Sequence, residues 1–434
     1  MTTPSARPLW RGRALALVGI VLVAFSLRSA VASLSPVVDH IAQDFALSPV
    51  AVGLIGAAPP VCFAVFGIIT PLLERRFGLE RVAVVAIAFV AAGLLLRGFA
   101  VDSVTLLGAT ALVFAGVGAG NVLLPPLVKK YFPDRLGLMM SLYATIMAVS
   151  TFVPPLVAVP VADTLGWRVS LGMWGIFAAL ALVPWMTLLI RERASTPAAV
   201  PPVPDPPANA QNAADPAVVV TGPIAVAPPS SRAFGRLWRL PLAWALAVVF
   251  AASATIAYVS FAWLPTILVD IGGVSAATAG LLLSLFALVS LPGSMVVPVL
   301  IVRFQATRPI FFVAVISGIL GLSGLLLAPT AALALWVSLF GVTAILFPLC
   351  LVLISIRARS HDSAVALSGF VQSVGYAIAA VFPLLIGLLH EVTGGWQIPI
   401  LVIVGVLIAS IPAGVMAGRR KTIEDEWERR HGSW

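Results

Sequence analysis

The chain has 434 residues, of which 60% are hydrophobic and only 10% are charged, and its mean hydropathy is +1.08. Soluble domains carry about 25% charged residues, so this composition excludes an ordinary soluble protein and indicates a protein embedded in lipid. The net charge of +9 would suggest a nucleic-acid partner in a soluble protein. Here the basic residues lie in short segments between apolar runs, which is the pattern of membrane topology. The two cysteines, Cys62 and Cys350, lie in apolar stretches and imply neither a disulfide framework nor a cysteine-based metal site.

Twelve apolar runs are long enough to cross the hydrocarbon core as helices. The weakest boundary between them is Ala328-Pro329-Thr330, which separates the ninth run from the tenth. The N-terminal residues also resemble a signal peptide, with Ala30-Val31-Ala32 as a cleavage-like site, but eleven further runs follow and we interpret this stretch as the first span. The predicted spans are 15–36, 49–73, 82–100, 104–128, 137–160, 169–190, 240–268, 277–301, 309–328, 332–356, 364–389 and 398–417.

The distribution of Lys and Arg predicts the orientation of these spans. With the N-terminus inside, 23 of the 26 basic residues fall in cytoplasmic segments, and the exceptions are Arg28, Arg97 and Arg168. Positive charge is enriched in cytoplasmic loops. The sequence therefore predicts a multi-pass protein of a bacterial inner membrane, with both termini in the cytoplasm.

A change of composition divides the chain into two halves. Residues 194–232 contain ten prolines, many alanines and almost no periodicity, which predicts a disordered cytoplasmic linker. We therefore predict an N-terminal six-helix bundle at 1–193, a linker at 194–238, a C-terminal six-helix bundle at 239–418 and a cytoplasmic tail at 419–434.

The two halves look like copies of one another. Matches recur at a nearly constant offset of 225 to 229 residues along several helices, and two related six-helix halves are typical of transporters with a substrate site between them. The matched pairs are Gly53 with Gly280, Pro71 with Pro298, Arg76 with Arg303, Gly116-Val117 with Gly341-Val342, Pro154 with Pro383, and Gly166-Trp167 with Gly395-Trp396.

These features resemble the major facilitator superfamily. The loop between the second and third spans, Pro71-Leu-Leu-Glu74-Arg75-Arg76-Phe-Gly78-Leu-Glu80-Arg81, is similar to a degenerate form of the superfamily's G-x-L-x-D-R-x-G-R-R loop, with Pro71 in place of the first glycine and the acidic residue displaced to Glu74. The resemblance implies an all-α membrane protein of twelve helices in two pseudo-symmetric six-helix bundles.

Within the superfamily, the chain most resembles the cyanate and 2-nitroimidazole porter group. This resemblance implies a small solute, often anionic or nitroaromatic. It is carried by Leu27-Arg28-Ser29, Gly120-Asn121-Val122-Leu123-Leu124-Pro125, Ala262-Trp263-Leu264-Pro265 and Gly369-Phe370-Val371-Gln372-Ser373-Val374-Gly375-Tyr376.

Arg28 is the strongest candidate for a functional residue. A charge inside a span usually faces a cavity and marks function, and Arg28 lies about two-thirds of the way across the first span. Asp39 is 11 residues away, roughly 16 Å along a helix, and no Asp or Glu lies well inside any predicted span. A bound anion would supply the missing counter-ion. The alternative is an arginine held by backbone carbonyls or by Asn and Tyr side chains.

The other polar residues in the spans have functional and structural interpretations. Asn121 either bridges packed helices or lines a cavity. Ser368, Gln372 and Tyr376 share one helix face, which favours an aqueous cavity over lipid. Tyr143, Tyr258 and Trp263 would suit a flat solute, but aromatic residues at such spacing often only pack. For Arg97 we expect the side chain to reach the headgroups, and for Arg168 we expect an interfacial anchor.

The predicted substrate-binding residues are therefore Arg28, Asn121, Tyr143, Tyr258, Trp263, Gln372 and Tyr376, with no catalytic residue, metal or cofactor. The sequence contains no G-x-x-x-x-G-K-[ST], H-E-x-x-H or G-x-S-x-G motif, which disfavours an ATP-driven pump and an intramembrane enzyme. A receptor is disfavoured by the internal repeat. We expect a monomeric secondary or facilitative transporter that works by alternating access. An efflux porter with a broader range of drugs or metabolites is the alternative.

Overall fold

The computed structural model describes residues 13–132, 136–195, 235–359 and 361–431, and these residues form helices and no strand. The first half contains α1 (Ala14–Ala32), η1 (Ser35–Val37), α2 (Val38–Asp44), α3 (Pro49–Phe77), α4 (Leu79–Gly98), α5 (Ser103–Tyr131), α6 (Leu136–Leu165), α7 (Trp167–Gly172) and α8 (Gly175–Ser195). The second half contains α10 (Pro241–Gly272), α11 (Ala276–Phe304), α12 (Thr307–Leu327), α13 (Leu333–Gly341), η3 (Val342–Ile345), α14 (Leu346–Ile356), α15 (His361–Ala379), α16 (Val381–Thr393), α17 (Gln397–Ala409), α18 (Ile411–Ala417) and α19 (Ile423–His431).

Twelve stretches of these helices are long and apolar enough to cross a membrane, which confirms the predicted number of spans. The break expected at Ala328-Pro329-Thr330 is present, because α12 ends at Leu327 and α13 begins at Leu333. Some spans are built from two helices. The eleventh changes from α15 to α16 at Ala380, three residues before Pro383, because a proline removes a backbone donor and crowds the preceding turn.

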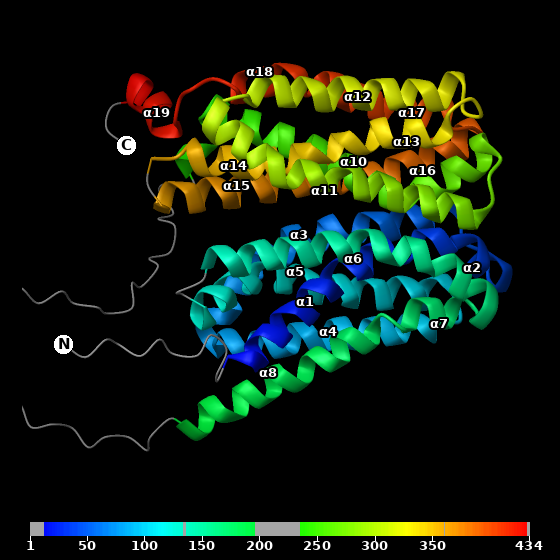
Figure 1. Ribbon diagram of the computed structural model, residues 1–434, viewed down its shortest axis with the longest axis horizontal. Coiled ribbons are helices and arrows are strands. Elements are labelled where there is room, and N and C mark those ends of the chain that lie inside the picture. The colour runs from blue at the N-terminus through cyan, green and yellow to red at the C-terminus, as the bar shows by residue number, and fades with distance from the viewer. Residues whose placement is uncertain (1–12, 133–135, 196–234, 360, 432–434) are drawn as a thin grey trace, which may run out of the picture.

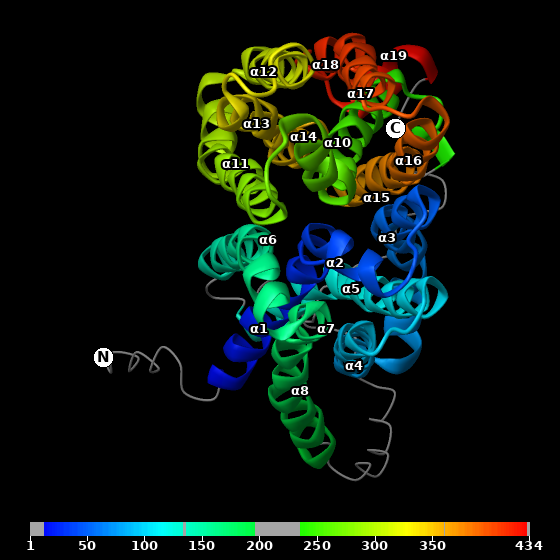
Figure 2. The same ribbon diagram turned by 90° about the vertical axis from the view of Figure 1, so that its right-hand side faces the viewer.

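The helices are arranged as two bundles that lie against each other (Figures 1 and 2). One bundle contains α1 to α8 and the other contains α10 to α18, with α19 packed on the second bundle at the end of the molecule from which both termini leave (Figure 1). We call this the terminal end, and the end that carries α2 and α7 the opposite end. Helices α3 and α6 of the first bundle contact α15, α16 and α11 of the second.

Close contacts between the bundles lie near the opposite end and repeat in the two halves. A Cβ atom added at Gly53 in α3 would lie 2.9 Å from the Cα atom of Leu384 and 3.0 Å from the carbonyl oxygen of Pro383. A Cβ atom added at Gly280 in α11 would lie 2.7 Å from the carbonyl oxygen of Pro155. Only glycine permits such an approach of two backbones. The predicted match of Gly53 with Gly280 thus corresponds to equivalent contacts between the halves, with Pro383 in one contact and Pro155, the residue after Pro154, in the other.

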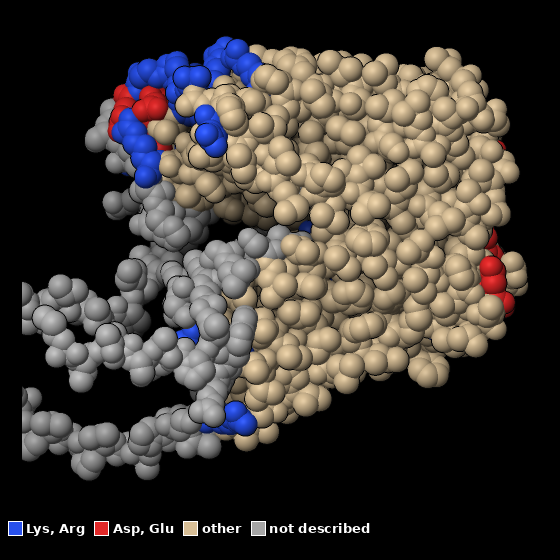
Figure 3. Space-filling view, viewed as in Figure 1, with Lys and Arg blue, Asp and Glu red and all other residues tan. Residues whose placement is uncertain are grey.

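Charged residues are concentrated at the two ends. Figure 3 shows Lys and Arg side chains together with some acidic ones at the terminal end, only acidic side chains at the opposite end, and a surface between them that is almost free of charge. At the terminal end, the buried carboxylate of Glu80 at the start of α4 pairs with Lys130 and accepts a hydrogen bond from Tyr131 at 3.3 Å. The nearly uncharged surface between the two ends is the surface expected of a protein surrounded by lipid tails.

Two predicted segments lie mainly outside the twelve spans. Most of the predicted linker 194–238 lies outside the described residues; α8 extends to Ser195, and the chain is described again from residue 235. The predicted tail 419–434 contains α19, whose Ile423 backbone N–H donates to the carbonyl of Arg357 at 2.9 Å. The tail therefore packs on the end of the tenth span.

Candidate functional site

Arg28 lies in the last third of α1, a helix formed from an almost continuously apolar stretch. Its guanidinium makes a side-chain hydrogen bond to the hydroxyl of Tyr258 on α10, in the other bundle. Arg28 retains some exposed surface, whereas Tyr258 is only 4% exposed. The predicted charge inside the first span thus lies at the boundary between the halves.

Two further tyrosines surround the same guanidinium. Tyr143 on α6 and Tyr376 on α15 both lie within electrostatic range of Arg28, and Tyr376 also makes a hydrogen bond with Tyr258. The ring centroids of Tyr258 and Tyr376 are 6.2 Å apart. The structure therefore brings together four of the seven predicted residues, Arg28, Tyr143, Tyr258 and Tyr376, from four different helices.

This cluster contains a charge without a protein counter-ion. Among the described residues, every recorded electrostatic partner of Arg28 is a tyrosine, and no carboxylate takes part. Removing an ion from water costs several kcal/mol unless an opposite charge or good hydrogen bonds compensate. Neutral phenols compensate only in part, so the cluster favours an anion that binds the guanidinium.

Gln372 and Ser368 extend the cluster along α15. The Gln372 side-chain amide donates to the Ser368 hydroxyl at 2.7 Å, and both side chains are half-buried. Gln372 lies one turn before Tyr376, so the predicted polar stripe is a single face that continues from the tyrosines. The amide oxygen of Gln372 has no hydrogen-bond donor recorded among the described residues and is available to a ligand.

The structure gives Asn121 and Trp263 different surroundings. Asn121 on α5 is half-buried, and no hydrogen bond of its side chain is recorded within the described part of the chain. Trp263 on α10 is buried, and its indole donates to the carbonyl of Pro383 at 2.8 Å, with the ring against Trp396. The only polar atom of the Trp263 side chain is therefore used in the contact between α10 and α16, and this residue stands apart from the Arg28 cluster.

Arg97 corrects one expectation from the sequence. Its side chain does not reach the headgroups but is 0% exposed inside the first bundle. Its Nη1 atom donates to the carbonyl oxygen of Ala30 at 2.7 Å, and its Nε atom donates to the hydroxyl of Thr110 at 3.1 Å. The position of Arg97 near the end of α4 suggested an exposed side chain. It is buried because α4 packs against α1 and α5 there, and because the carbonyls at the end of α1 attract the guanidinium. Arg168, by contrast, lies on the surface and pairs with Asp44.

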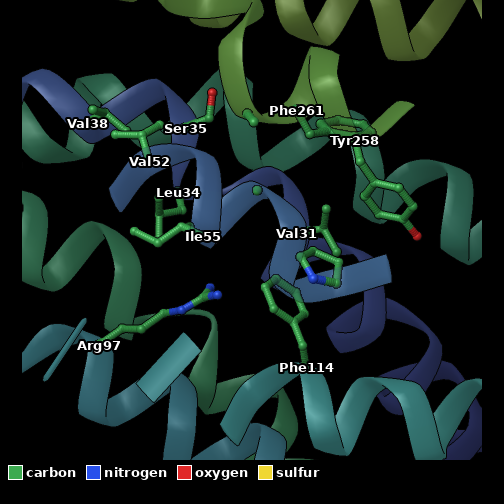
Figure 4. A pocket seen from close by; sticks show the side chains of 13 residues that line it. Val31, Leu34, Ser35, Val38, Val52, Ile55, Arg97, Phe114, Tyr258 and Phe261 are labelled. Atoms are coloured by element: carbon green, nitrogen blue, oxygen red, sulfur yellow. The ribbon is translucent and has the colours of Figure 1, made fainter. Parts of the chain in front are cut away.

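A pocket lies between Arg97 and Tyr258 (Figure 4). Its free volume is about 20 Å³, and its wall is mostly apolar. In Figure 4, Arg97 reaches in from α4, while Tyr258 comes from α10 on the other side. Because the Tyr258 hydroxyl also contacts Arg28, one residue joins this pocket to the tyrosine cluster.

Sequence reasoning did not identify two residues of this region. Phe63 on α3 packs edge-on against Tyr258 and Tyr376, with ring centroids 6.1 and 5.6 Å away. Phe114 on α5 lies beneath the Arg97 guanidinium, 5.1 Å from its centre to the ring centroid. Phenylalanine is common in apolar spans, so no sequence signal distinguishes these two.

No group of three or more His, Cys, Asp or Glu side chains suited to a metal occurs in the described ranges.

Comparisons with known proteins agree with this architecture. Residues 20–380 match the model of the Major Facilitator Superfamily. The chain is 30% identical over 419 residues to the 2-nitroimidazole transporter of Escherichia coli strain K12, which covers 95% of this chain and 98% of that protein. It is 26% identical over 403 residues to the cyanate transport protein CynX of the same organism, covering 90% and 95% of the two chains.

A solved structure supports the fold independently. The bacterial homolog of the human lysosomal transporter Spinster superposes with a TM-score of 0.72 at 17% identity, covering 97% of this chain and 99% of that one. At this identity, the similarity shows the fold alone. With the family model matching most of its length and a transporter relative matching nearly all of it, the chain is a member of the major facilitator superfamily and a membrane transporter of small solutes.

Proposed function

We propose that the protein carries a small anion across the membrane by alternating access, with Arg28 as the principal contact of the bound anion. The observation that supports this most directly is a guanidinium at the boundary of the two halves that is surrounded by tyrosines and has no carboxylate partner among the described residues. A transporter of this superfamily exposes its central site to each side in turn. Contacts from both halves, Arg28 and Tyr143 from one and Tyr258 and Tyr376 from the other, suit a site that closes around its substrate.

A small planar nitrogen compound is the second substrate class. Phe63, Tyr258, Tyr376 and Phe250 form a chain of edge-on aromatic contacts beside Arg28, with ring centroids 5.0 to 6.2 Å apart. Aromatic walls favour flat ligands, and Gln372 would offer a hydrogen bond to a ring nitrogen or nitro group. The relatives that transport 2-nitroimidazole and cyanate are consistent with both classes.

We also propose the orientation and the state of the protein in the cell. The Lys and Arg side chains gathered at the terminal end favour placing that end, with both termini, in the cytoplasm of a bacterial inner membrane. We propose that a monomer is the transport unit. We assign the bundles to 1–193 and 239–418, joined by the linker 194–238.

No Asp or Glu lies well inside any of the spans, and this bears on coupling. Proton-coupled transporters commonly use Asp or Glu side chains inside the membrane. We propose that this protein works by facilitated movement, by anion exchange, or by symport in which the substrate carries the proton. A proton flux that persists with a substrate unable to bind protons would contradict this.

The test is uptake of labelled cyanate, formate and 2-nitroimidazole into proteoliposomes containing the purified protein. Arg28→Ala should abolish saturable uptake, and Arg28→Lys should restore little of it, because an ammonium cannot make the planar, paired contacts of a guanidinium. Reconstitution yield and thermal stability show whether each variant is folded.

Arg168→Gln is the matched control, because Arg168 is a surface arginine that pairs with Asp44 at the opposite end. We expect uptake by this variant to remain within about twofold of the wild type, since exposed pairs contribute little. Near-normal uptake by Arg28→Ala would remove Arg28 from the site and overturn the proposal.

A further inference from the structure

The Arg97 guanidinium is a second buried cation, and one of its nitrogens has no partner. Nη1 and Nε are occupied by the Ala30 carbonyl and the Thr110 hydroxyl, whereas Nη2 is buried without a hydrogen-bond partner among the described residues. No ion pair of Arg97 with a carboxylate is recorded within these ranges either. A buried donor that is left unsatisfied costs about 1–3 kcal/mol, and more when the group is charged. A purely structural role for Arg97 accounts for two of its nitrogens and leaves the third unexplained.

The pocket beside Arg97 is where a missing partner would bind. Arg97 lines this pocket, and Figure 4 shows the guanidinium directed into it. Ser35 of η1 also lines it, and its hydroxyl is likewise buried without a recorded partner among the described residues. The rest of the wall is apolar, apart from Tyr258, and includes Ile55 and Phe114. Since the wall supplies hydrogen-bond donors and no carboxylate, its chemistry selects an anion over a cation or a neutral polar molecule.

The pocket also has a defined place relative to Arg28. Arg97 binds the carbonyl of Ala30, only two residues after Arg28 on α1, which is a rise of about 3 Å. Tyr258 borders the pocket with its ring and contacts Arg28 with its hydroxyl. Gly56 also lies in the pocket wall, and it belongs to α3, the helix that contacts the other bundle at the opposite end. The pocket thus lies between the closed opposite end and the Arg28 cluster.

We propose that the Arg97 pocket is a second anion-binding subsite. It takes a small monovalent anion, linear or planar, through the free Nη2 atom of Arg97, and holds it one step away from Arg28 on the path to the opposite end. The role of this subsite as a step on the transport path rests on the function proposed above. The binding of an anion at Arg97 does not depend on that function, and it can be tested in a variant that lacks the Arg28 guanidinium.

The experiment measures thermal stabilisation of the purified full-length protein by potassium cyanate and by sodium formate, with formamide as the neutral analogue. The Arg28→Gln variant isolates the proposed subsite. We expect it to show saturable stabilisation by both anions and none by formamide. Adding Arg97→Gln to the Arg28→Gln variant should raise the apparent dissociation constant of cyanate and of formate by about tenfold or more, because a hydrogen bond to a charged group is lost. Adding Arg168→Gln instead should leave the constant unchanged.

A second variant keeps the test informative if Arg97→Gln impairs folding. Ile55 and Arg97 both line the pocket (Figure 4). In the Arg28→Gln background, Ile55→Glu places a carboxylate where the anion would bind, and it should stabilise the protein without added anion and abolish stabilisation by cyanate and formate. Absence of any anion effect in Arg28→Gln, or an effect that survives both Arg97→Gln and Ile55→Glu, would overturn the subsite. Normal uptake by Arg28→Ala would contradict only the function proposed for Arg28.

Discussion

Trp167 and Trp396 make the same hydrogen bond in the two halves of the molecule. The indole of Trp167 donates to the carboxylate of Asp44 at 3.0 Å, and the indole of Trp396 donates to that of Asp270 at 2.7 Å. The tryptophans are 229 residues apart and the aspartates 226, so the contact follows the repeat found in the sequence. In each half it ties the chain at the start of the sixth span to an aspartate at the opposite end of the molecule, which lies at the end of α2 in the first half and at the end of α10 in the second.

Trp167→Phe and Trp396→Phe should therefore have similar effects. Each removes a hydrogen bond that the indole donates to a carboxylate and that stabilises the fold, while an aromatic ring remains. We expect each variant to unfold at a lower temperature in a thermal-shift assay. The double variant should show the sum of the two shifts, since distant sites act independently. A large loss for one tryptophan and none for the other would show that the halves are not equivalent here.

The glycine contacts between the bundles predict control of the conformational equilibrium. Gly53→Val and Gly280→Val each introduce a side chain where a Cβ atom alone would lie within 3.0 Å of the other half. The clash penalises the state described here, in which the opposite end is closed. We expect these variants to favour separation of the halves at that end without unfolding either bundle, because the added atoms meet only the neighbouring half.

Spin labels on Leu165 and Val392 measure this separation. Both residues are exposed, lie in different halves and stand in the last turns of α6 and α16 at the opposite end. Cys62→Ala with Cys350→Ala removes the native thiols. The distance between the labels should lengthen in Gly53→Val and Gly280→Val. It should stay unchanged in Gly405→Val, because a Cβ atom at Gly405 meets nothing within 4 Å. Unchanged distances in all three variants would contradict the predicted control.

The contact of α19 with the loop after α14 predicts a dependence of stability on pH. The backbone N–H of Thr422 and the guanidinium of Arg359 both bind the Asp425 carboxylate and lower its pKa from 3.8 to about 2. Arg359 also donates to Glu428 at 2.8 Å. Because the pKa of Asp425 is lower in the folded protein, this contact stabilises the fold above pH 3.8 and its contribution disappears as the pH falls toward 2.

Asp425→Asn should remove that contribution. The Asp425 side chain is 37% exposed, so solvent screens the pair and we expect a loss of no more than about 1 kcal/mol at neutral pH. The difference in unfolding temperature between wild type and Asp425→Asn should shrink as the pH is lowered from 5 to 2. Glu391→Gln, at an exposed residue of α16, controls for the general effect of removing an acidic charge. A difference that is constant across this range would exclude the titration of Asp425 as its cause.

Much of the fold was predictable because its signals are local. Hydrophobic runs, prolines and loop charges are each read along a short stretch of chain, and they predicted twelve spans with the break after Leu327 correctly. The repeat extended this to two equivalent halves, as the contacts of Gly53 and Gly280 confirm. Arg28 was also identifiable, because a charge in the middle of an apolar span is costly wherever the helix packs.

The surroundings of those charges were decided by tertiary structure alone. Arg97 stands near a helix end in the sequence, but the packing of α4 against α1 and α5 buries it and leaves one nitrogen without a partner. The same packing places Phe63 and Phe114, ordinary residues of apolar helices, beside Tyr258 and Arg97. Sequence by itself determined which segments enter the membrane and that Arg28 is unusual, because transfer into lipid depends on local composition. Only the tertiary structure decided which side chains meet, because helix faces come together through contacts between residues far apart in the chain.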